Sequence, residues 1–325
     1  MKNVICFFYV LLLLGCQKAD DVSNLIQPPE HYPYIEYPTN NQVTAARLAL
    51  GKKLFFDPQL SLDSTISCAS CHLPEYAFSD TIPLSKGVGG AFGSRNAPSL
   101  LNVAYVPYFN KDGGVKKLDL FALVPIEDHK EMAISALALT KRLAANDTLQ
   151  AEAQAAYGRP LDPFVMTRSL GLYVRSLISG DSKYDAYLKD KLALSAAEER
   201  GRILFHSEKT NCSSCHEGVF FTNHQFENNG TKETYTDQGR KLVTSKESDR
   251  AKFKVASLRN VAVTGPYMHD GSYVSLESIV ENYDKGGFEH KNKSALVRPL
   301  GLNEQEKADL VTFLHTLTDK KYAAY

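Results

Sequence analysis

Two copies of one short pattern, Cys-x-x-Cys-His, constrain this chain more than any other feature of its sequence. SCASCH covers residues 67–72 and NCSSCH covers residues 211–216. The 325 residues contain six cysteines, and four of them lie in these two copies, 144 positions apart. Any function assigned to this pattern must therefore explain why the chain contains it twice.

Two cysteines and a histidine within five positions are compatible with a disulfide, a zinc site, a redox dithiol or an attached haem. A zinc ribbon keeps its cysteine pairs closer together and does not need the histidines. A redox dithiol is normally single, and the histidine adds nothing to thiol exchange. A c-type haem uses every residue, because both sulfurs bond to the porphyrin and the histidine ligates the iron. The duplication therefore predicts two covalent haem c groups, held by Cys68, Cys71 and His72 and by Cys212, Cys215 and His216.

The N-terminus, MKNVICFFYVLLLLGC, predicts export from the cytoplasm. Its apolar run from Val4 to Leu14 is shorter than the ~20 residues that span a bilayer, but it suits the core of a signal peptide. The ending LLGC is typical of a bacterial lipoprotein signal, which predicts a signal peptide at 1–15 and a lipid on Cys16. An ordinary secretory signal is the alternative. Both predict a periplasm-facing protein, and lipidation would also anchor it to a membrane.

The charge balance and the chain length limit the partners and the number of domains. Lysine plus arginine equal aspartate plus glutamate at 37 each, so nothing indicates nucleic acid or an anionic surface as partner. Residues 16–41 are polar and carry prolines, which predicts an extended tether. The rest of the chain is long enough for two cores, and the two motifs predict one haem domain at 42–185 and another at 186–325.

An internal repeat indicates the fold class. Each haem motif follows a helical pattern with Gly, two residues and Leu-Phe near its end, in LGKKLFF (50–56) and RGRILF (200–205). Ser195 with Glu198 and Asn303 with Glu306 form capping boxes. Apolar residues at three-and-four spacing predict further helices at 131–145 and 163–179, and few segments resemble strands. We therefore predict a mainly α protein made of two cytochrome c-like domains.

Several separated motifs resemble the bacterial di-haem cytochrome c peroxidase family, which includes the MauG-type enzymes. They are LGKKLFFDPQLS with SCASCHLPEYAFSD, SKGVGGAFGSRNAPSLLNVAY, FKVASLRNVAVTGPYMHDGSYVSLESIVENY and LNEQEKADLVTFLHTLT. The resemblance covers residues 45–318. It implies a peroxidatic haem in the N-terminal domain, an electron-transferring haem in the C-terminal domain, and reduction of hydrogen peroxide to water. A small cytochrome c or a similar carrier would supply the electrons. A homodimer is one possible assembly, which the sequence does not decide.

The resemblance places the catalytic carboxylate at Glu131, opposite His72 across the first haem. Without the resemblance, Glu131 would be interpreted as an acidic residue in the first turn of a helix. Some members of the family carry a removable histidine ligand where this chain has Val88, and no other histidine lies between His72 and His129. We therefore expect the first iron to be five-coordinate or water-bound and to need no reductive activation.

Two departures from the family pattern affect the expected reaction. Lys111 stands where the family usually has a tryptophan between the haems, and the chain has no tryptophan at all. Phe121 replaces a distal glutamine, which leaves fewer hydrogen-bond donors for bound peroxide. Because the tryptophan between the haems is missing, electron transfer between them must follow another path.

The sixth ligand of the second iron has two candidates. The position of the peroxidases' methionine is Tyr283 here, as in MauG-type proteins, and Met268 is the alternative. A buried tyrosine that does not ligate is also compatible with the sequence. His269 is expected near the edge of the haem. Met166 lies in an amphipathic pattern and is expected in the core.

The family often binds calcium between its two haem domains. The resemblance places its ligands at the side chain of Asn96 and the carbonyls of Thr264 and Pro266, which would suit a hard cation. The alternative is an asparagine and a proline that simply form turns.

Three functions remain to be separated. The first is a di-haem cytochrome c peroxidase, the second is a MauG-like oxidase that uses peroxide to oxidise a protein substrate, and the third is a di-haem electron carrier without catalysis. A carrier normally keeps both irons six-coordinate, so Glu131 and the missing distal histidine argue against the third.

Overall fold

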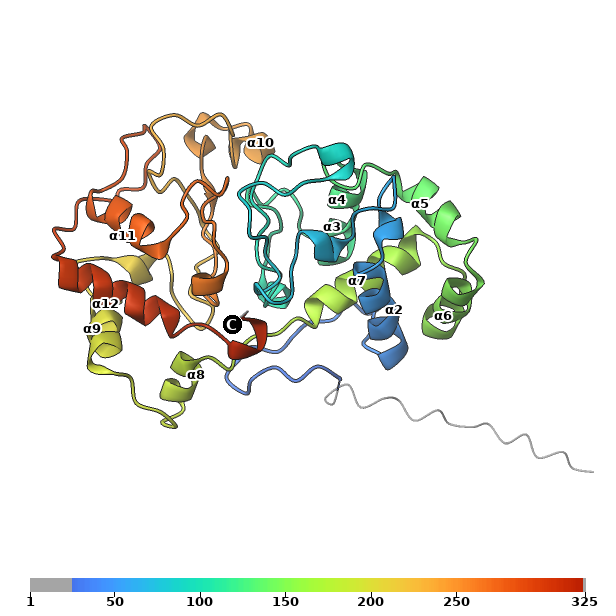
Figure 1. Ribbon diagram of the computed structural model, residues 1–325, viewed down its shortest axis with the longest axis horizontal. Coiled ribbons are helices and arrows are strands. Elements are labelled where there is room, and N and C mark those ends of the chain that lie inside the picture. Colours follow the sequence, from blue (N-terminus) through green and yellow to red (C-terminus); the bar gives the residue numbers. More distant parts are fainter. Residues whose placement is uncertain (1–24, 324–325) are drawn as a thin grey trace, which may run out of the picture.

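The computed structural model describes residues 25–323, and helices dominate it (Figure 1). The two short strands, β1 (Phe226–Glu227) and β2 (Phe253–Lys254), pair antiparallel, with Phe226 opposite Lys254. The mainly α prediction is confirmed. The helices are α2 (Ala45–Phe55), α3 (Leu118–Phe121), α4 (Leu123–Glu127), α5 (Ala136–Leu143), α6 (Asp147–Tyr157), α7 (Pro163–Arg175), α8 (Lys183–Leu188), α9 (Ala196–Phe205), α10 (Lys241–Thr244), α11 (Leu276–Asp284) and α12 (Glu304–His315).

The helices form two groups, each around its own apolar cluster. In Figure 1, α2 to α7 lie on one side and α8, α9, α11 and α12 on the other. The first cluster includes Leu54, Phe55 and Met166, and the second includes Phe205, Leu310 and Phe313. Met166 is fully buried, so its predicted place in the core is confirmed. We call these the first and the second helix group.

The same close helix crossing occurs in both groups, which explains the repeated glycine. Gly51 of α2 lies against the backbone of Ser169 in α7, and Gly201 of α9 lies against the backbone of Asp309 in α12. A Cβ at either glycine would overlap a carbonyl group of the partner helix. The repeat therefore fixes the packing of the helix that leads into each haem motif.

The predicted helix caps are confirmed. Ser195 accepts a hydrogen bond from the backbone N–H of Glu198, and the Glu198 side chain accepts one from the N–H of Ser195 at 2.6 Å. Asn303 and Glu306 make the same pair of bonds at the start of α12. Each box satisfies two backbone donors at a helix start.

The prediction of a tether at 16–41 is wrong for the part that the structure describes. Residues 25–41 have little regular structure, yet Ile26, Tyr32 and Ile35 are buried. Ile26 and Ile35 pack against Leu172, and Tyr32 donates a hydrogen bond to the Ser179 carbonyl at 2.7 Å. The few apolar side chains here are spaced between prolines and show neither a helical nor a strand period, so the sequence pattern does not predict this packing.

The position between the helix groups lies slightly earlier than the predicted boundary at 185/186. Tyr184, which that boundary assigns to the first domain, packs in the second cluster. The division of the chain into two domains remains a prediction.

The predicted signal peptide and Cys16 lie outside the described residues. Within residues 25–323, no helix combines the length and the apolar character that crossing a membrane would require.

Candidate haem and peroxide sites

The two Cys-x-x-Cys-His motifs adopt the same local structure. Each begins with a short 3-10 helix, Cys68–Ser70 in the first copy and Cys212–Ser214 in the second. The N–H of His72 donates to the carbonyl of Cys68 at 3.0 Å, and the N–H of His216 donates to that of Cys212 at 2.9 Å. The turn thus places both thiols and the imidazole of each copy close together.

Both histidines are oriented in the way that an iron ligand requires. Nδ1 of His72 lies 2.9 Å from the carbonyl oxygen of Phe78, and Nδ1 of His216 lies 3.0 Å from that of Phe221. A carbonyl can only accept, so Nδ1 carries the proton and Nε2 keeps its lone pair. Each imidazole is therefore prepared to bind a metal through Nε2.

The structure argues against a disulfide or a shared zinc site. The four motif cysteines are unpaired, and no cluster of three or more His, Cys, Asp or Glu residues suited to a metal occurs among residues 25–323. The two pairs lie in different helix groups, so they cannot complete one tetrahedral zinc site. The residues present fit a c-type haem at each copy.

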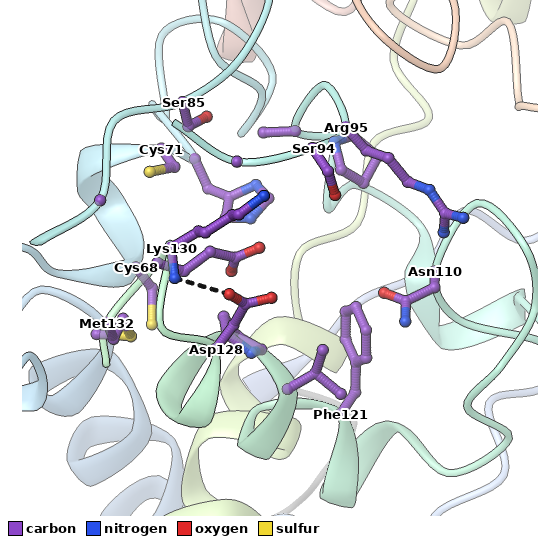
Figure 2. Close-up of a pocket in the computed structure, with 18 of the residues that line it drawn as sticks. Cys68, Cys71, Ser85, Ser94, Arg95, Asn110, Phe121, Asp128, Lys130 and Met132 are labelled. Carbon is purple, nitrogen blue, oxygen red and sulfur yellow. Dashed lines mark hydrogen bonds between the residues drawn. The ribbon is translucent and has the colours of Figure 1, made fainter. Parts of the chain in front are cut away.

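A cavity of about 650 Å³ opens beside the first motif (Figure 2). This volume lies within the range of ~300–1,000 Å³ that holds cofactors and small ligands. Cys68, Cys71, His72 and Glu131 all line it. The cavity therefore brings the predicted haem anchor and the predicted catalytic carboxylate together.

Glu131 lies in the loop between α4 and α5, so the alternative interpretation as a residue of a helix's first turn is wrong. The helix predicted at 131–145 begins only at Ala136, capped by Ser135. The Glu131 carbonyl accepts from the N–H of Val88 at 2.8 Å, which fixes the loop against a neighbouring turn. Burial, helped by the nearby charge of Asp128, raises the pKa of Glu131 to about 7. The carboxyl group can thus both accept and release a proton near neutral pH.

Phe121 and Lys111, the two departures from the family pattern, both line this cavity, whereas Val88 does not. Phe121 lines it, is labelled in Figure 2, and stacks on Phe109 with ring centroids 5.6 Å apart. Val88 is not among the lining residues, and His72 is the one histidine among them. Within the described residues, the side of the cavity facing His72 is therefore free of a second imidazole.

Ion pairs connect this cavity to the second helix group. Arg95, which lines it, binds Asp237 through Nε at 2.6 Å and Asp112 through Nη1 at 2.6 Å. Arg95 also lies over the ring of Phe253, 5.8 Å from its centroid. The wall of the first site is thus partly built by residues that follow the second motif.

At the second motif, one amide group contacts both candidates for the sixth ligand. Asn229 Nδ2 donates to the hydroxyl oxygen of Tyr283 at 3.0 Å and lies 3.4 Å from Sδ of Met268. Tyr283 belongs to α11, whereas Met268 lies in a loop and has a left-handed backbone with φ of +74°. Both side chains therefore reach the same region, and which of them would ligate the iron stays a prediction.

His269 stacks in an aromatic cluster beside these residues. Its ring lies 4.1 Å from that of Phe253, nearly parallel, and 5.7 Å from that of Tyr235. Burial lowers the pKa of His269 to about 4, so the imidazole is neutral at pH 7. The predicted role of His269 at the haem edge remains untested.

The surroundings of Asn96 do not fit the predicted calcium ion. Asn96 Oδ1 accepts a long hydrogen bond, 3.5 Å, from the ammonium group of Lys111. The amide nitrogen donates to the carbonyl of Ile82 at 3.4 Å. Thr264 and Pro266 would add only carbonyl oxygens, and calcium needs six to eight oxygens without a competing cation. The only side-chain ligand predicted for calcium is therefore already in contact with a positive charge.

Sequence reasoning missed Asn229, Arg95 and Asp237. Their roles depend on partners 17 to 142 positions away, such as Asp112 and Asp237 for Arg95 and Met268 for Asn229. No motif or period marks such residues. The one local signal for Arg95 is its position next to Asn96 in SRNAPS (94–99).

Comparison with known proteins identifies the family. Residues 45–193 match the family model described as di-haem cytochrome c peroxidase. The chain is 36% identical to the methylamine utilization protein MauG of Methylorubrum extorquens, over 89% of this chain and 82% of that protein. It is 30% identical to the cytochrome c551 peroxidase of Pseudomonas aeruginosa, over 93% of this chain and 86% of that protein.

Solved structures agree with this. A crystal structure of a MauG-like protein associated with microbial copper homeostasis matches with a TM-score of 0.85 and 32% identity, covering 90% of this chain and 95% of that one. The diheme peroxidase BthA of Burkholderia thailandensis matches with a TM-score of 0.78 and 27% identity, covering 87% and 88%. The chain belongs to the di-haem cytochrome c peroxidase family and is an oxidoreductase of the peroxidase type.

Proposed function

We propose that the chain reduces hydrogen peroxide in the cavity shared by His72 and Glu131, using electrons that enter through the second motif at His216. The observation that carries this proposal is the single cavity lined by Cys68, Cys71, His72 and Glu131. Two covalent haem groups, one in each of two domains at 42–185 and 186–325, complete the proposal. A haem c bound through His72 would supply an iron centre that accepts peroxide and passes electrons to it.

Glu131 moves the proton that the reaction requires. Its carboxylate oxygen accepts a proton from one oxygen of hydrogen peroxide and returns it to the other, which then leaves as water. Overall, one hydrogen peroxide, two protons and two electrons give two waters. Phe121 adds an apolar ring to the wall, so that position offers bound peroxide no proton acceptor.

The reaction should depend on pH through Glu131. Because the carboxylate form accepts the first proton, kcat/KM is expected to rise as the pH passes through about 7. Asp128→Asn removes a charge that raises the pKa of Glu131, so its midpoint should move to lower pH. Initial rates across the neutral range would check this, and a flat profile for the unmodified protein would contradict it.

At the second site, we propose Tyr283 as the sixth ligand, with Asn229 positioning its hydroxyl group. The support is the 3.0 Å hydrogen bond between them. Oxidised protein should then lack the long-wavelength charge-transfer band of methionine-ligated haem. Met268→Leu should leave the spectrum unchanged, whereas Tyr283→Phe should change it. Presence of the band in the unmodified protein, with its loss in Met268→Leu, would assign Met268 instead.

A MauG-like oxidation of a protein substrate is the second candidate, favoured by the tyrosine at position 283 and by the relatives named MauG. A non-catalytic electron carrier is the third. Addition of stoichiometric peroxide, with and without a reduced cytochrome c, separates them. We expect peroxide loss with oxidation of two cytochromes per peroxide. A long-lived two-electron-oxidised state that does not oxidise the cytochrome would favour the MauG-like candidate. The absence of any reaction with peroxide would favour the electron carrier.

We also propose that the mature chain is anchored by lipid on Cys16 and faces the periplasm, where a small cytochrome c donates electrons to it. The N-terminal sequence supports this placement. A homodimer is proposed from the resemblance alone. Mass spectrometry of the mature N-terminus would test the lipid, since replacement of Cys16 by Ser should abolish it.

A further inference from the structure

Lys111 lies at the contact between the two helix groups. Its ammonium nitrogen lies 3.0 Å from the carbonyl oxygen of Met268 and 3.5 Å from Asn96 Oδ1. Asn96 precedes α3 in the first helix group, whereas Met268 follows the second haem motif. The Lys111 side chain therefore contacts a side-chain oxygen of the first helix group and a backbone oxygen of the second.

The loop that carries Lys111 is bound to the second group along its length. The carbonyl of Lys111 accepts from the N–H of Lys254 at 2.7 Å, and Lys254 Nζ donates to the carbonyl of Tyr108 at 2.6 Å. Arg240 Nη1 donates to the carbonyls of Asp112 and Gly113 at 2.7 and 3.1 Å. These bonds hold the Lys111 side chain in place between the groups.

The charges around Lys111 make it an internal cation rather than half of an ion pair. No ion pair of Lys111 within 4.0 Å occurs among residues 25–323. Asp270 is the carboxylate that acts on it from further away, while Arg95 and Lys254 are nearby cations. Its direct partners are neutral oxygens, the same type of donor that a hard metal cation would use.

We propose that the Lys111 ammonium takes the structural place of a divalent cation between the helix groups, so that this chain holds them together without calcium. Of the predicted calcium ligands, Lys111 contacts Asn96, and the Met268 carbonyl is its second oxygen partner. Burial lowers the pKa of Lys111 to about 7, so the ammonium form predominates below that pH. The proposal concerns the structure between the sites and does not depend on peroxidase activity.

The first test uses the purified holoprotein without any mutation. Metal analysis after dialysis against buffer without chelator should find no calcium beyond a trace amount. The unfolding temperature should be the same in millimolar calcium as in EDTA. A stoichiometric calcium ion, or an unfolding temperature that rises with calcium, would overturn the proposal.

The second test removes the ammonium group. Lys111→Ala and the similarly sized Lys111→Met should each lower the unfolding temperature by about 5 °C. Lys116→Ala, an exposed lysine in the same loop, should not. Methylammonium should restore part of the loss in Lys111→Ala, because it can fill the vacated position, and should not help Lys111→Met. Equal stability of the Lys111 and Lys116 variants would overturn the proposal, and so would the absence of methylammonium rescue.

Discussion

Replacement of Glu131 by Gln is expected to lower peroxidase turnover by roughly 10²- to 10⁴-fold, the usual effect of losing a positioned acid–base group. Glutamine keeps the size and hydrogen-bonding capacity of the side chain but cannot accept the proton from peroxide. The Cys68, Cys71 and His72 anchor is untouched, so the haem spectrum should stay nearly the same. Steady-state oxidation of a reduced cytochrome c by peroxide measures the effect.

Glu127→Gln is the matched control for this variant. Glu127 lies four positions earlier, is exposed, and does not line the cavity. It should keep turnover within about twofold of the unmodified protein, because its side chain accepts only from the N–H of Ala136 in the described residues, at 3.1 Å, and glutamine can keep that bond. Normal turnover in Glu131→Gln would remove Glu131 from the mechanism, even if the pocket is otherwise correct.

Replacement of Asp185 by Asn should destabilise the protein by about 3–5 kcal/mol, the typical cost of leaving a buried charge without its partner. Asp185 is fully buried and binds both terminal nitrogens of Arg259 at 2.9 Å. Arg259 also donates to the carbonyl of Val219 at 2.6 Å, two residues before the Phe221 that orients His216. Loss of this pair should therefore also loosen the second haem site.

The pH dependence of stability offers a second measurement on the same pair. Burial alone would raise the pKa of Asp185, but hydrogen bonds from Arg259 outweigh it and lower the pKa from 3.8 to about 2. Because its pKa is lowered, Asp185 stabilises the folded protein fully above pH 3.8, and this stabilisation is lost as the pH falls towards 2. Asp185→Asn should lack this part of the acid dependence.

An exposed pair provides the control for Asp185. Lys53 and Glu152 are 2.8 Å apart but remain about 40% exposed, so Glu152→Gln should cost at most about 1 kcal/mol. Chemical denaturation of the three proteins gives the comparison. A cost for Asp185→Asn no greater than that for Glu152→Gln would show that the buried pair contributes little.

Much of the fold could be predicted because its signals are local. The capping boxes at Ser195 and Asn303 and the two motif turns depend on residues within one or two turns of chain. The helix predicted at 131–145 failed in its first turn for a physical reason. Ala133 has a left-handed backbone with φ of +58°, and the loop there is held by Val88, which no local period reveals.

The candidate site could be predicted only where a motif marks it. His72 and Glu131 are 59 positions apart, and a resemblance rather than spacing paired them. Asn229 contacts Tyr283 and Met268 through a loop without regular structure, so the sequence could not indicate it. Likewise, Lys111 appeared as the loss of a tryptophan, whereas its contact with Asn96 shows what the lysine itself does.

We propose that the two copies of the Cys-x-x-Cys-His motif serve different purposes, with the His72 site open to peroxide and the His216 site closed. Electron paramagnetic resonance of the fully oxidised protein tests this most directly, before and after one equivalent of peroxide. We expect the signals of one high-spin and one low-spin iron per chain. The high-spin signal should disappear when peroxide is added, without prior reduction of the protein. Two low-spin irons that ignore peroxide until the protein is half-reduced would contradict the account.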